Sequence, residues 1–483
     1  MLLGWKKPSI VYNKGVHCMK EYRVLSPTAI LGYGFPEASF EAGLRLDPHV
    51  IAVDAGSTDP GPYYLGSGKS FTDAAAVKRD LSYMLTAAIK HKIPLIIGTA
   101  GGSGANSHLY WNVDIICELA KELGLDFKLA IIESELSCEL VLQNYEKGKL
   151  KELYPAPKPI IEDIKSSVNI VAQMGHEPFI KALEQDAQVI ISGRAYDPVM
   201  FAALAIKHEF DTGLALHMGK ILECAAIAAT PGSGSDCMIG YLRGDHFELE
   251  ALNPMRICTT TSIAAHTLYE KSNPTKLPGP GGVLDLTHTT FKQHNNNVIV
   301  HGTQFIPDST YFVKLEAAKK LGYRTISFAS TTDPIFIENL EGILEDVKTK
   351  ISNNFNNIKD FFLDFHIYGE KAAGLFDIKS ASSFENKHNK TLEIAVLIEA
   401  VAKTQALADT ICSFARSTLL HFGYNNRKST AGNLAFPFSP SDFKAGTVYE
   451  FSLYCLMQIE NPSDFFPVKI YKCEKGELND KII

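Results

Sequence analysis

Four turns of this sequence place polar or ionisable side chains directly after a short apolar run. The first turn supplies carboxylates and hydroxyls, and the second supplies glycines, a hydroxyl and an amide. The third supplies carboxylates alone, and the fourth supplies a guanidinium and a carboxylate. Turn by turn, the candidate binding and catalytic residues are Asp54, Ser57, Thr58 and Asp59; Gly101, Gly102, Ser103, Gly104 and Asn106; Glu133 and Glu135; and Arg194 and Asp197. One such turn is ordinary, because Gly, Asp and Ser form tight turns for local reasons. Four of them at one edge of a sheet are typical of a ligand site.

The chemistry that these residue types suit is the binding of an anion. Glycines between a buried strand and the start of a helix, as at Gly101–Gly104, let backbone N–H groups approach a negative charge that the helix dipole also favours. Arg194 adds a planar guanidinium that fits a carboxylate or a phosphate. The glycine spacing is neither that of a dinucleotide-binding turn nor that of a P-loop. The sequence therefore predicts a phosphate or carboxylate site and specifies no nucleotide.

Reaction at such a site also needs a group that transfers protons. The candidate catalytic residues are His217, Asp59, Arg194 and Asp197. His217 is included because an imidazole titrates near neutral pH and needs little tuning as an acid or a base. His246 and His266 are alternatives, and we expect at most one of the three histidines to face the site. A divalent metal stays open as a cofactor, but no residues have the tight spacing of a metal-binding motif, so we assign no metal ligands.

Alternating strands and helices must position these turns. Short, continuous apolar runs are typical of strands buried on both faces of a parallel sheet. They occur at Ala29–Tyr33, Val50–Asp54, Pro94–Gly98, Leu129–Glu133 and Val189–Ser192. Apolar stripes with helical spacing lie between several runs, as over Phe71–Lys90 and Ile115–Leu123. We therefore predict an α/β fold with a doubly wound, mostly parallel sheet over residues 25–235, which carries the anion site.

The rest of the chain is richer in strands. Alternation of polar and apolar residues predicts antiparallel strands at 283–288, 298–301 and 311–315, which we place in a linking β layer over residues 236–320. The segment 321–483 shows a strand, a helix, two strands, a helix and a strand in that order. The β-α-β-β-α-β order predicts a ferredoxin-like α+β domain. Because such a domain more often assembles than catalyses, we expect a homo-oligomer.

Composition limits the partners and the compartment. The 483 residues carry a net charge of -7 and 46% of them are hydrophobic, which is ordinary for a globular protein and leaves no positive field for nucleic acid or anionic lipid. No apolar run reaches the roughly 18 residues that a membrane span needs. The 9 cysteines include no C-x-x-C pair, which disfavours a disulfide framework. We expect a cytoplasmic protein with neither nucleic acid nor a membrane as a partner.

Six longer motifs resemble those of the acyclic terpene utilisation family. They begin at Asp54, Gly98, Ser192, His217, Pro231 and Leu277, and read DAGSTDPGPYYLG, GTAGGSGAN, SGRAYDP, HMGKILEC, PGSGSD and LPGPGG. The resemblance extends from about Ile30 to the segment 448–451. It implies a catabolic protein that acts near small carboxylic acids or their CoA thioesters, with CoA as part of the substrate. A small companion domain found with some members is missing here, so the resemblance also implies a separate companion subunit.

Two functional hypotheses follow. The first is a catabolic enzyme with lyase, hydratase or isomerase chemistry, which needs an anion clamp, a proton-transfer group and donors for a developing oxyanion. The alternative is a non-catalytic nucleotide- or CoA-binding subunit of a multi-component catabolic enzyme. The many ionisable residues beside the glycine turn favour the enzyme, because a binding loop alone does not require them.

Overall fold

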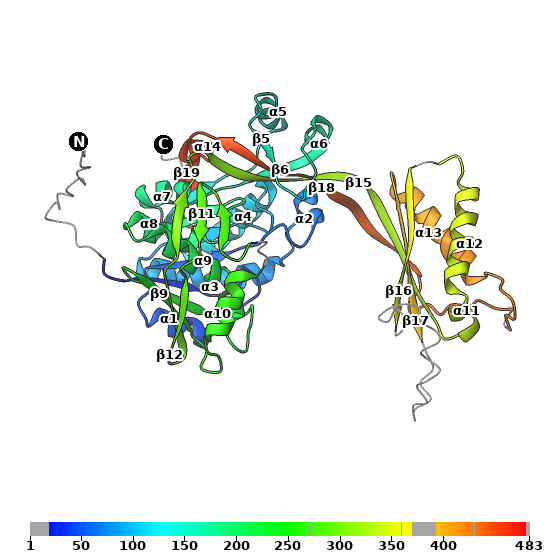
Figure 1. Cartoon of the computed structure of the whole chain (residues 1–483), viewed down its shortest axis with the longest axis horizontal. Coiled ribbons are helices and arrows are strands. Elements are labelled where there is room, and N and C mark those ends of the chain that lie inside the picture. Colours follow the sequence, from blue (N-terminus) through cyan, green and yellow to red (C-terminus); the bar gives the residue numbers. More distant parts are fainter. Residues whose placement is uncertain (1–18, 270–272, 359, 370–392, 429, 480–483) are drawn as a thin grey trace, which may run out of the picture. The chain divides into compact units, whose positions relative to one another are not determined.

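The computed structural model describes residues 19–269, 273–358, 360–369, 393–428 and 430–479. The chain forms two compact units, a larger one made of residues 1–317 and 452–483 and a smaller one made of residues 318–451 (Figure 1). The sequence predicts boundaries near residues 235 and 320. The second of these falls inside strand β15 (Tyr311–Thr331), whose residues are divided between the two units.

The core of the larger unit is an eleven-stranded mixed sheet. Its central strands run parallel and are, in spatial order, β1 (Tyr22–Ser26), β2 (Val50–Asp54), β3 (Leu95–Gly98), β7 (Val189–Ser192) and β4 (Asp126–Ile132). Antiparallel strands extend both sides, with β8 (Met238–Leu242), β9 (His246–Ala251), β13 (Asn297–His301) and β12 (Thr290–His294) beyond β1, and β19 (Val468–Glu474) and β20 (Glu477–Asn479) beyond β4. The carboxyl ends of the central strands therefore share one edge of the sheet.

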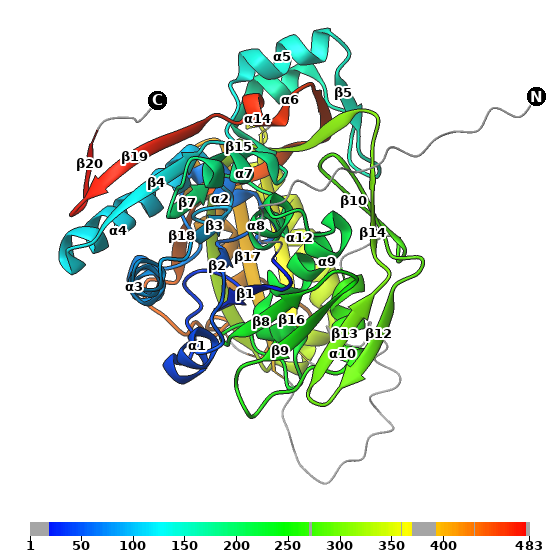
Figure 2. The same cartoon turned by 90° about the vertical axis from the view of Figure 1, so that its left-hand side faces the viewer.

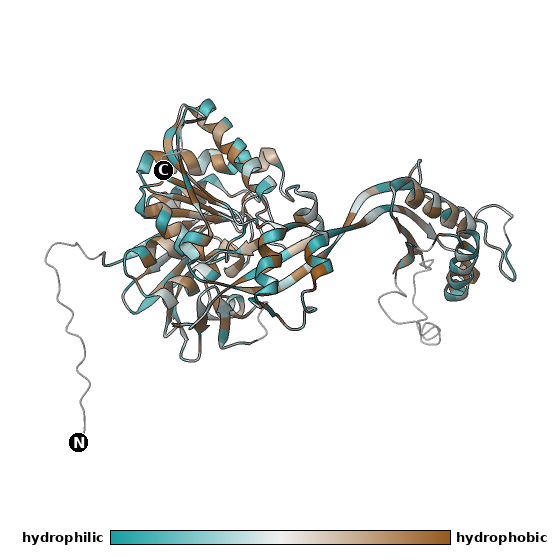
Figure 3. Cartoon of the chain, turned by 90° about the horizontal axis from the view of Figure 1, so that it is seen from above, coloured by the Kyte–Doolittle hydropathy of each residue, from teal (hydrophilic) through white to brown (hydrophobic). Residues whose placement is uncertain are grey.

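Helices cover both faces of this sheet (Figure 2). On one face lie α1 (Glu37–Leu44), α3 (Ala74–His91) and α4 (Asn106–Leu123), and on the other α7 (Glu177–Glu184), α8 (Val199–Lys207) and α9 (Thr212–Leu222). Alternate residues of a strand enter the two cores, so that in β2 Val50 and Ala52 pack on one side and Ile51 and Val53 on the other. Burial on both sides explains why the central strands are continuous apolar runs. In Figure 3, which colours the ribbon by hydropathy, brown hydrophobic stretches lie in the interior of the unit.

Shorter elements complete the larger unit. They are α2 (Pro62–Ser67), α5 (Cys138–Glu146), β5 (Leu150–Glu152), α6 (Ile161–Ser166), β6 (Ser167–Gln173), a 3-10 turn (Ala225–Ala228), α10 (Thr260–Leu268), β10 (Lys276–Gly279), β11 (Gly282–Asp285), β14 (Gln304–Pro307) and α14 (Pro462–Phe465). Strands β10, β11 and β14 form a separate three-stranded sheet. Strand β6 pairs with β15, and β5 pairs with Cys455–Met457 of β18 (Asp442–Ile459).

The structure differs from the sequence prediction at two places in the part of this unit that precedes β15. The segment Ala29–Tyr33 forms turns, and the first strand is β1 instead, because Gly32 has a φ of +103°, outside the range of an extended strand. Strands β8, β9, β12 and β13, expected in a linking layer, extend the main sheet and make it mixed rather than mostly parallel. Residue alternation identifies a half-exposed antiparallel strand but not the sheet that it joins.

The described residues of the smaller unit form four strands in the order β16 (Phe361–Gly369), β17 (Ile394–Ala402), β15 and β18. Helices α11 (Pro334–Glu338), α12 (Leu340–Asn354) and α13 (Gln405–Leu420) pack against this sheet through one hydrophobic core. Strands β16 and β17 pair antiparallel along their whole length, and the elements follow the β-α-β-β-α-β order that the sequence predicts. The first residue of the strand expected from Leu392 lies outside the described residues.

The C-terminal segment, expected in the smaller unit, belongs to the larger one. Strand β19 pairs antiparallel with β4 from Val468↔Ile132 to Glu474↔Asp126. This pairing supplies hydrogen bonds to one side of β4 that would otherwise be an open sheet edge. Ile470, which is 1% exposed, packs into the core on the α7 side.

We predict that Ile470→Ala destabilises the larger unit by about 2–5 kcal/mol, the usual cost of truncating a buried isoleucine to alanine. Thermal unfolding followed by circular dichroism measures this as a lower midpoint. Lys472→Ala is the matched control on the same strand, because the Lys472 side chain is 59% exposed and its loss should leave the midpoint nearly unchanged. Equal midpoints for both variants would contradict the assignment of β19 to this core.

Candidate functional site

A cavity of about 600 Å³ opens in the larger unit beside the carboxyl ends of β2 and β7, a size ordinary for small-molecule sites. Its polar lining combines three cationic side chains with three carboxylates. The ionisable residues and the tyrosines that line it are Asp59, Lys151, Arg194, Tyr196, Asp197, Asp308, Lys314 and Tyr454. Three of the residues predicted from the sequence, Asp59, Arg194 and Asp197, thus reach one cavity.

Arg194 lines the cavity and is held by two carboxylates. Its side chain is 4% exposed, and its Nε donates to Oε2 of Glu316 at 2.7 Å while Nη1 donates to Oδ1 of Asp197 at 3.0 Å. Its backbone nitrogen donates to the Ser134 hydroxyl at 2.6 Å. A Cβ on Gly104 would lie 2.1 Å from that nitrogen, so the glycine is required for the close approach of two turns.

Glu316 links Arg194 to the turn after β2 and to a second cation on its own strand. Its Oε1 accepts from the Thr58 hydroxyl at 2.9 Å and lies 2.9 Å from Nζ of Lys314. Burial alone would raise the pKa of Glu316, but the charges of Arg194 and Lys314 outweigh it and lower the pKa to about 2. The carboxylate is therefore ionised and fully engaged, and it fixes both cations at the wall.

Several hydrogen-bond donors of this wall are left for a ligand. Among the residues that the structure describes, none accepts a hydrogen bond from Nη2 of Arg194. Tyr196 is among the residues that line the cavity, and its hydroxyl is buried and has no partner in the same described part of the chain. Burial, with added repulsion from Glu223 and Asp197, raises the pKa of Tyr196, so the hydroxyl keeps its proton. These groups suit a ligand with carboxylate or carbonyl oxygens.

A second group of buried ionisable residues interacts electrostatically with this wall. Lys220 and Glu223, at the end of α9, form an ion pair at 2.6 Å, and Nζ of Lys220 lies 4.2 Å from the ring centroid of Tyr269. Burial raises the pKa of Asp54 well above its ordinary value, and repulsion from Asp197 and Glu223 adds to the rise. Asp54 thus retains its proton to a higher pH than an exposed aspartate does.

The three candidate histidines lie elsewhere. His217 is buried, with Nδ1 2.7 Å from Thr303 Oγ1 and Nε2 3.0 Å from Thr267 Oγ1, and burial lowers its pKa to about 3. His266 stacks on Tyr269 at 4.5 Å, and burial lowers its pKa to about 4. His246 lies at the start of β9. None of the three is among the residues that line the cavity in the described part of the chain.

The glycine turn and its neighbours also lie outside the cavity lining. Gly101–Gly104 is buried, and the N–H groups of Gly102 and Gly104 donate to the carbonyls of Thr99 and Ala100. A Cβ on Gly102 would lie 2.5 Å from the Phe71 ring, while Ser103 Oγ is buried without a partner among the described residues. The turn therefore packs against protein where the sequence predicts an anion cradle.

Four further predicted residues have protein partners. The backbone N–H of Asn106, at the start of α4, donates to Glu135 at 2.7 Å, so a carboxylate of the chain occupies this helix end. Glu133 accepts from Tyr110 and Lys469. The Ser57 hydroxyl accepts from the backbone N–H of Asp59 at 3.1 Å. These contacts order the turns at the carboxyl edge of the sheet.

The sequence reasoning missed the residues that complete the site. They are Tyr196, Lys314, Glu316, Lys220 and Glu223. Lys314 and Glu316 lie two positions apart in β15 and so share one face of the strand. A lysine and a glutamate on the same face of one strand form the sequence pattern that could have indicated Lys314 and Glu316 as site residues.

An α/β unit with a small-molecule cavity at the carboxyl edge of its sheet is the class of protein that this fold and site define. Residues 71–236 and 253–433 match the acyclic terpene utilisation family protein AtuA, and the chain belongs to this family. The family name refers to the use of acyclic terpenes, which is consistent with a catabolic role. No curated protein and no solved structure matches the chain. Among the described helices, none combines the length and the apolar composition needed to cross a membrane.

We predict that Glu316→Gln destabilises the larger unit by about 3–5 kcal/mol, because it removes one partner of a buried ion pair and leaves Arg194 and Lys314 under-compensated. The effect depends on pH. Since the pKa of Glu316 is lowered from 4.5 to about 2, its charge stabilises the fold fully above 4.5, and the contribution disappears as the pH falls toward 2.

Thermal unfolding of the wild type and of Glu316→Gln, followed between about pH 7 and about pH 3, measures this dependence. The difference in midpoint should narrow as the solution becomes acidic. Glu460→Gln serves as the control, because the Glu460 side chain is 84% exposed and pairs only with Lys149 among the described residues. A difference that stays constant with pH would show that the Glu316 charge does not stabilise the fold.

Proposed function

We propose that this protein is a catabolic enzyme that acts on a small carboxylic acid or on the acyl group of a CoA thioester, with lyase, hydratase or isomerase chemistry. The observation that carries the proposal is Arg194, a guanidinium fixed by Glu316 and Asp197 in the wall of a cavity of small-molecule size. A fixed cation of this kind binds an oxyanion without rearrangement.

The ligand carboxylate, or the thioester carbonyl, accepts from Nη2 of Arg194 and from Nζ of Lys314. Both groups line the cavity, and Lys314 stays charged: burial would lower its pKa, but Glu316 raises it. Lys314 Nζ also lies 3.3 Å from the Tyr454 hydroxyl, which orients it. In this arrangement the negative end of the substrate lies against the wall formed by β15 and the turn after β7.

Proton transfer falls to the carboxylates that line the cavity. Asp197, whose side chain is 29% exposed, and Asp59 are the candidate bases that remove a proton next to the carbonyl or from water. Tyr196 keeps its proton and donates to the oxygen on which negative charge develops. Together, Arg194, Lys314, the two aspartates and Tyr196 supply the anion clamp, the base and the oxyanion donor that this chemistry requires.

The smaller unit supports a further part of the proposal. Its strand order β16-β17-β15-β18 and its β-α-β-β-α-β succession are those of the ferredoxin-like class, to which we assign it. A helix-covered sheet of this kind suits self-assembly, and we propose a homo-oligomer. Light scattering of the full chain measures its mass in solution.

We predict that Arg194→Lys weakens ligand binding by about 1–3 kcal/mol, since lysine keeps the charge but loses the planar fork of hydrogen bonds. Calorimetry with a panel of short carboxylic acids and their CoA thioesters measures this, guided by the compound that co-purifies with the protein. Arg416→Lys, at an ion pair with Asp442 in the smaller unit, is the matched control. The proposal fails if no acid or thioester binds, or if the affinity of Arg194→Lys equals that of the control.

Gly102→Val is unsuitable as a binding variant, although Gly102 is among the binding residues that the sequence predicts. Gly102 has a φ of +111°, and a side chain there would collide with Phe71, so the substitution tests packing of the turn and not ligand contact.

We also predict that Tyr196→Phe lowers kcat by about 10²–10³-fold, the usual loss for one oxyanion donor, and changes KM much less. Phenylalanine fits the site, because the hydroxyl has no partner among the described residues and its removal leaves no buried group unsatisfied. Steady-state turnover of the acid or thioester found in the panel measures the effect. Tyr33→Phe, at an exposed tyrosine, is the control. Binding without turnover in the wild type would instead support the non-catalytic subunit.

A further inference from the structure

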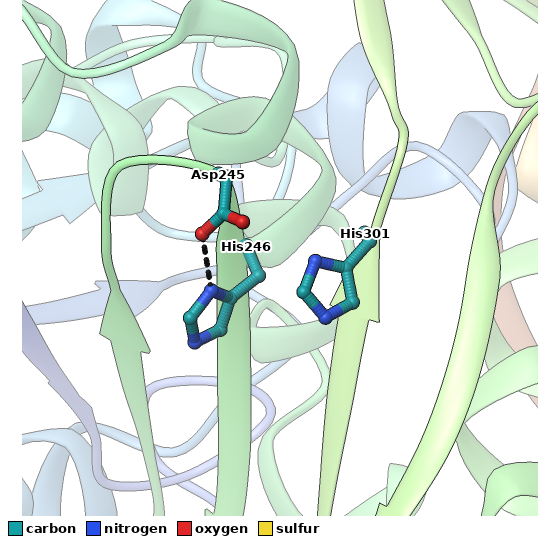
Figure 4. A group of neighbouring side chains, drawn as sticks. All are labelled: Asp245, His246 and His301. Carbon is teal, nitrogen blue, oxygen red and sulfur yellow. Dashed lines mark hydrogen bonds and ion pairs between the residues drawn. The ribbon is translucent and has the colours of Figure 1, made fainter.

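Three side chains with metal-binding atoms lie together at the start of β9 and the end of β13, outside the cavity. They are Asp245, His246 and His301, and one ligating atom from each lies within 4.8 Å of the other two. Figure 4 shows the Asp245 carboxylate against the His246 ring, with the His301 ring facing them from the neighbouring strand. Nδ1 of His246 and Oδ1 of Asp245 are 2.7 Å apart, and the ring centroids of His246 and His301 are 4.9 Å apart.

Strand register places these residues together. His246 begins β9 and His301 ends β13, and the two residues are direct cross-strand partners in the antiparallel pair. Direct partners project from the same face of a sheet, with Cβ atoms about 5 Å apart. Asp245 is the last residue of the turn between β8 and β9, so its carboxylate joins the pair from the end of the strand. The pairing of the two strands thus fixes the positions of His246 and His301, and the turn before β9 places the Asp245 carboxylate beside them.

We propose that Asp245, His246 and His301 form a binding site for a divalent transition-metal ion, with Zn²⁺, Co²⁺ and Ni²⁺ as the class of ligand. Two imidazoles and one carboxylate are donors that these ions prefer, whereas Mg²⁺ and Ca²⁺ prefer oxygen alone. Three protein ligands leave further coordination positions to water. The ion joins β9 to β13 and stabilises this side of the sheet.

The surroundings permit the small movement that coordination needs. Asp245 has 82% of its side chain exposed, so it turns freely to share the ion with His246. A cation, Arg243, lies beside the cluster, with its Nη1 3.5 Å from Nε2 of His246. Glu21 and Glu248 each pair with this guanidinium, at 2.7 and 3.0 Å, and offset its charge. The added positive charge of a metal ion is therefore tolerated at this place.

The site is distinct from the cavity. Tyr22 of β1 pairs with Leu242, and Leu242 pairs with Phe247, so His246 lies level with the amino end of β1. The cavity residues Arg194 and Asp197 follow the carboxyl end of β7, at the opposite edge of the sheet. Metal binding here is consequently independent of the proposed function, and either can fail without the other.

Calorimetry of the full chain, freed of metal by a chelator, tests the site with Zn²⁺ and with Mg²⁺. We expect Zn²⁺ to bind with a stoichiometry near one and to raise the unfolding midpoint, and Mg²⁺ to do neither. His301→Ala and Asp245→Asn should each weaken Zn²⁺ binding by at least about tenfold, since even residues that only hydrogen-bond a metal ligand contribute that much.

His294→Ala is the matched control, because His294 lies on the adjacent strand β12, pairs with Glu248 and has 53% of its side chain exposed. Zn²⁺ affinity of this variant should equal that of the wild type. Asp245→Asn removes an exposed carboxylate and keeps the fold, so its loss of affinity reports on coordination even if His301→Ala unfolds. Absence of Zn²⁺ binding to the wild type, or equal affinity in Asp245→Asn and His294→Ala, would overturn the proposal.

Discussion

Burial of one guanidinium governs the arrangement of the larger unit. A charged side chain that is only 4% exposed, as Arg194 is, costs several kcal/mol unless carboxylates compensate for the lost water. Asp197 supplies one carboxylate from the same turn, but Glu316 must come from 122 residues further along the chain. The first part of β15 therefore has to lie against the carboxyl edge of the sheet before the cavity can exist.

Glu316 extends this constraint to the rest of the site. It accepts from Thr58, in the turn after β2, and pairs with Lys314, so one carboxylate holds three segments in register. Because both of its oxygens have partners, Glu316 fixes the orientation of the Arg194 guanidinium. Among the described residues, none accepts from Nη2, and this nitrogen stays available to a ligand. Dipoles and charges that are already in place bind a developing negative charge without the cost of reorganisation.

The sequence identified the carboxyl-edge turns because continuous apolar runs predict buried parallel strands, and Asp59, Arg194 and Asp197 do reach one cavity. It missed Lys314 and Glu316. In a strand that alternates polar and apolar residues, the charged residues are normally assigned to the face that meets solvent. Here the face that carries Lys314 and Glu316 forms part of the cavity wall instead. It could not distinguish the two uses of the Gly101–Gly104 turn. Close packing of backbone against Arg194 and close approach to an anion both require the absence of a Cβ, so only tertiary contacts separate them.

The anion binding that we propose at Arg194 is linked to proton binding at Asp54. Repulsion from Asp197 and Glu223 already favours the protonated form of Asp54, and Arg194 opposes it. An anion bound to Arg194 would raise the pKa of Asp54, as the two carboxylates do. It would also cancel part of the positive charge by which Arg194 lowers this pKa, and so favour the protonated form of Asp54 further. By reciprocity, protonation of Asp54 strengthens the binding of the anion. Protonation of the buried Asp54 thereby offsets part of the negative charge that the proposed anion adds, without any change in the ion pairs around Arg194.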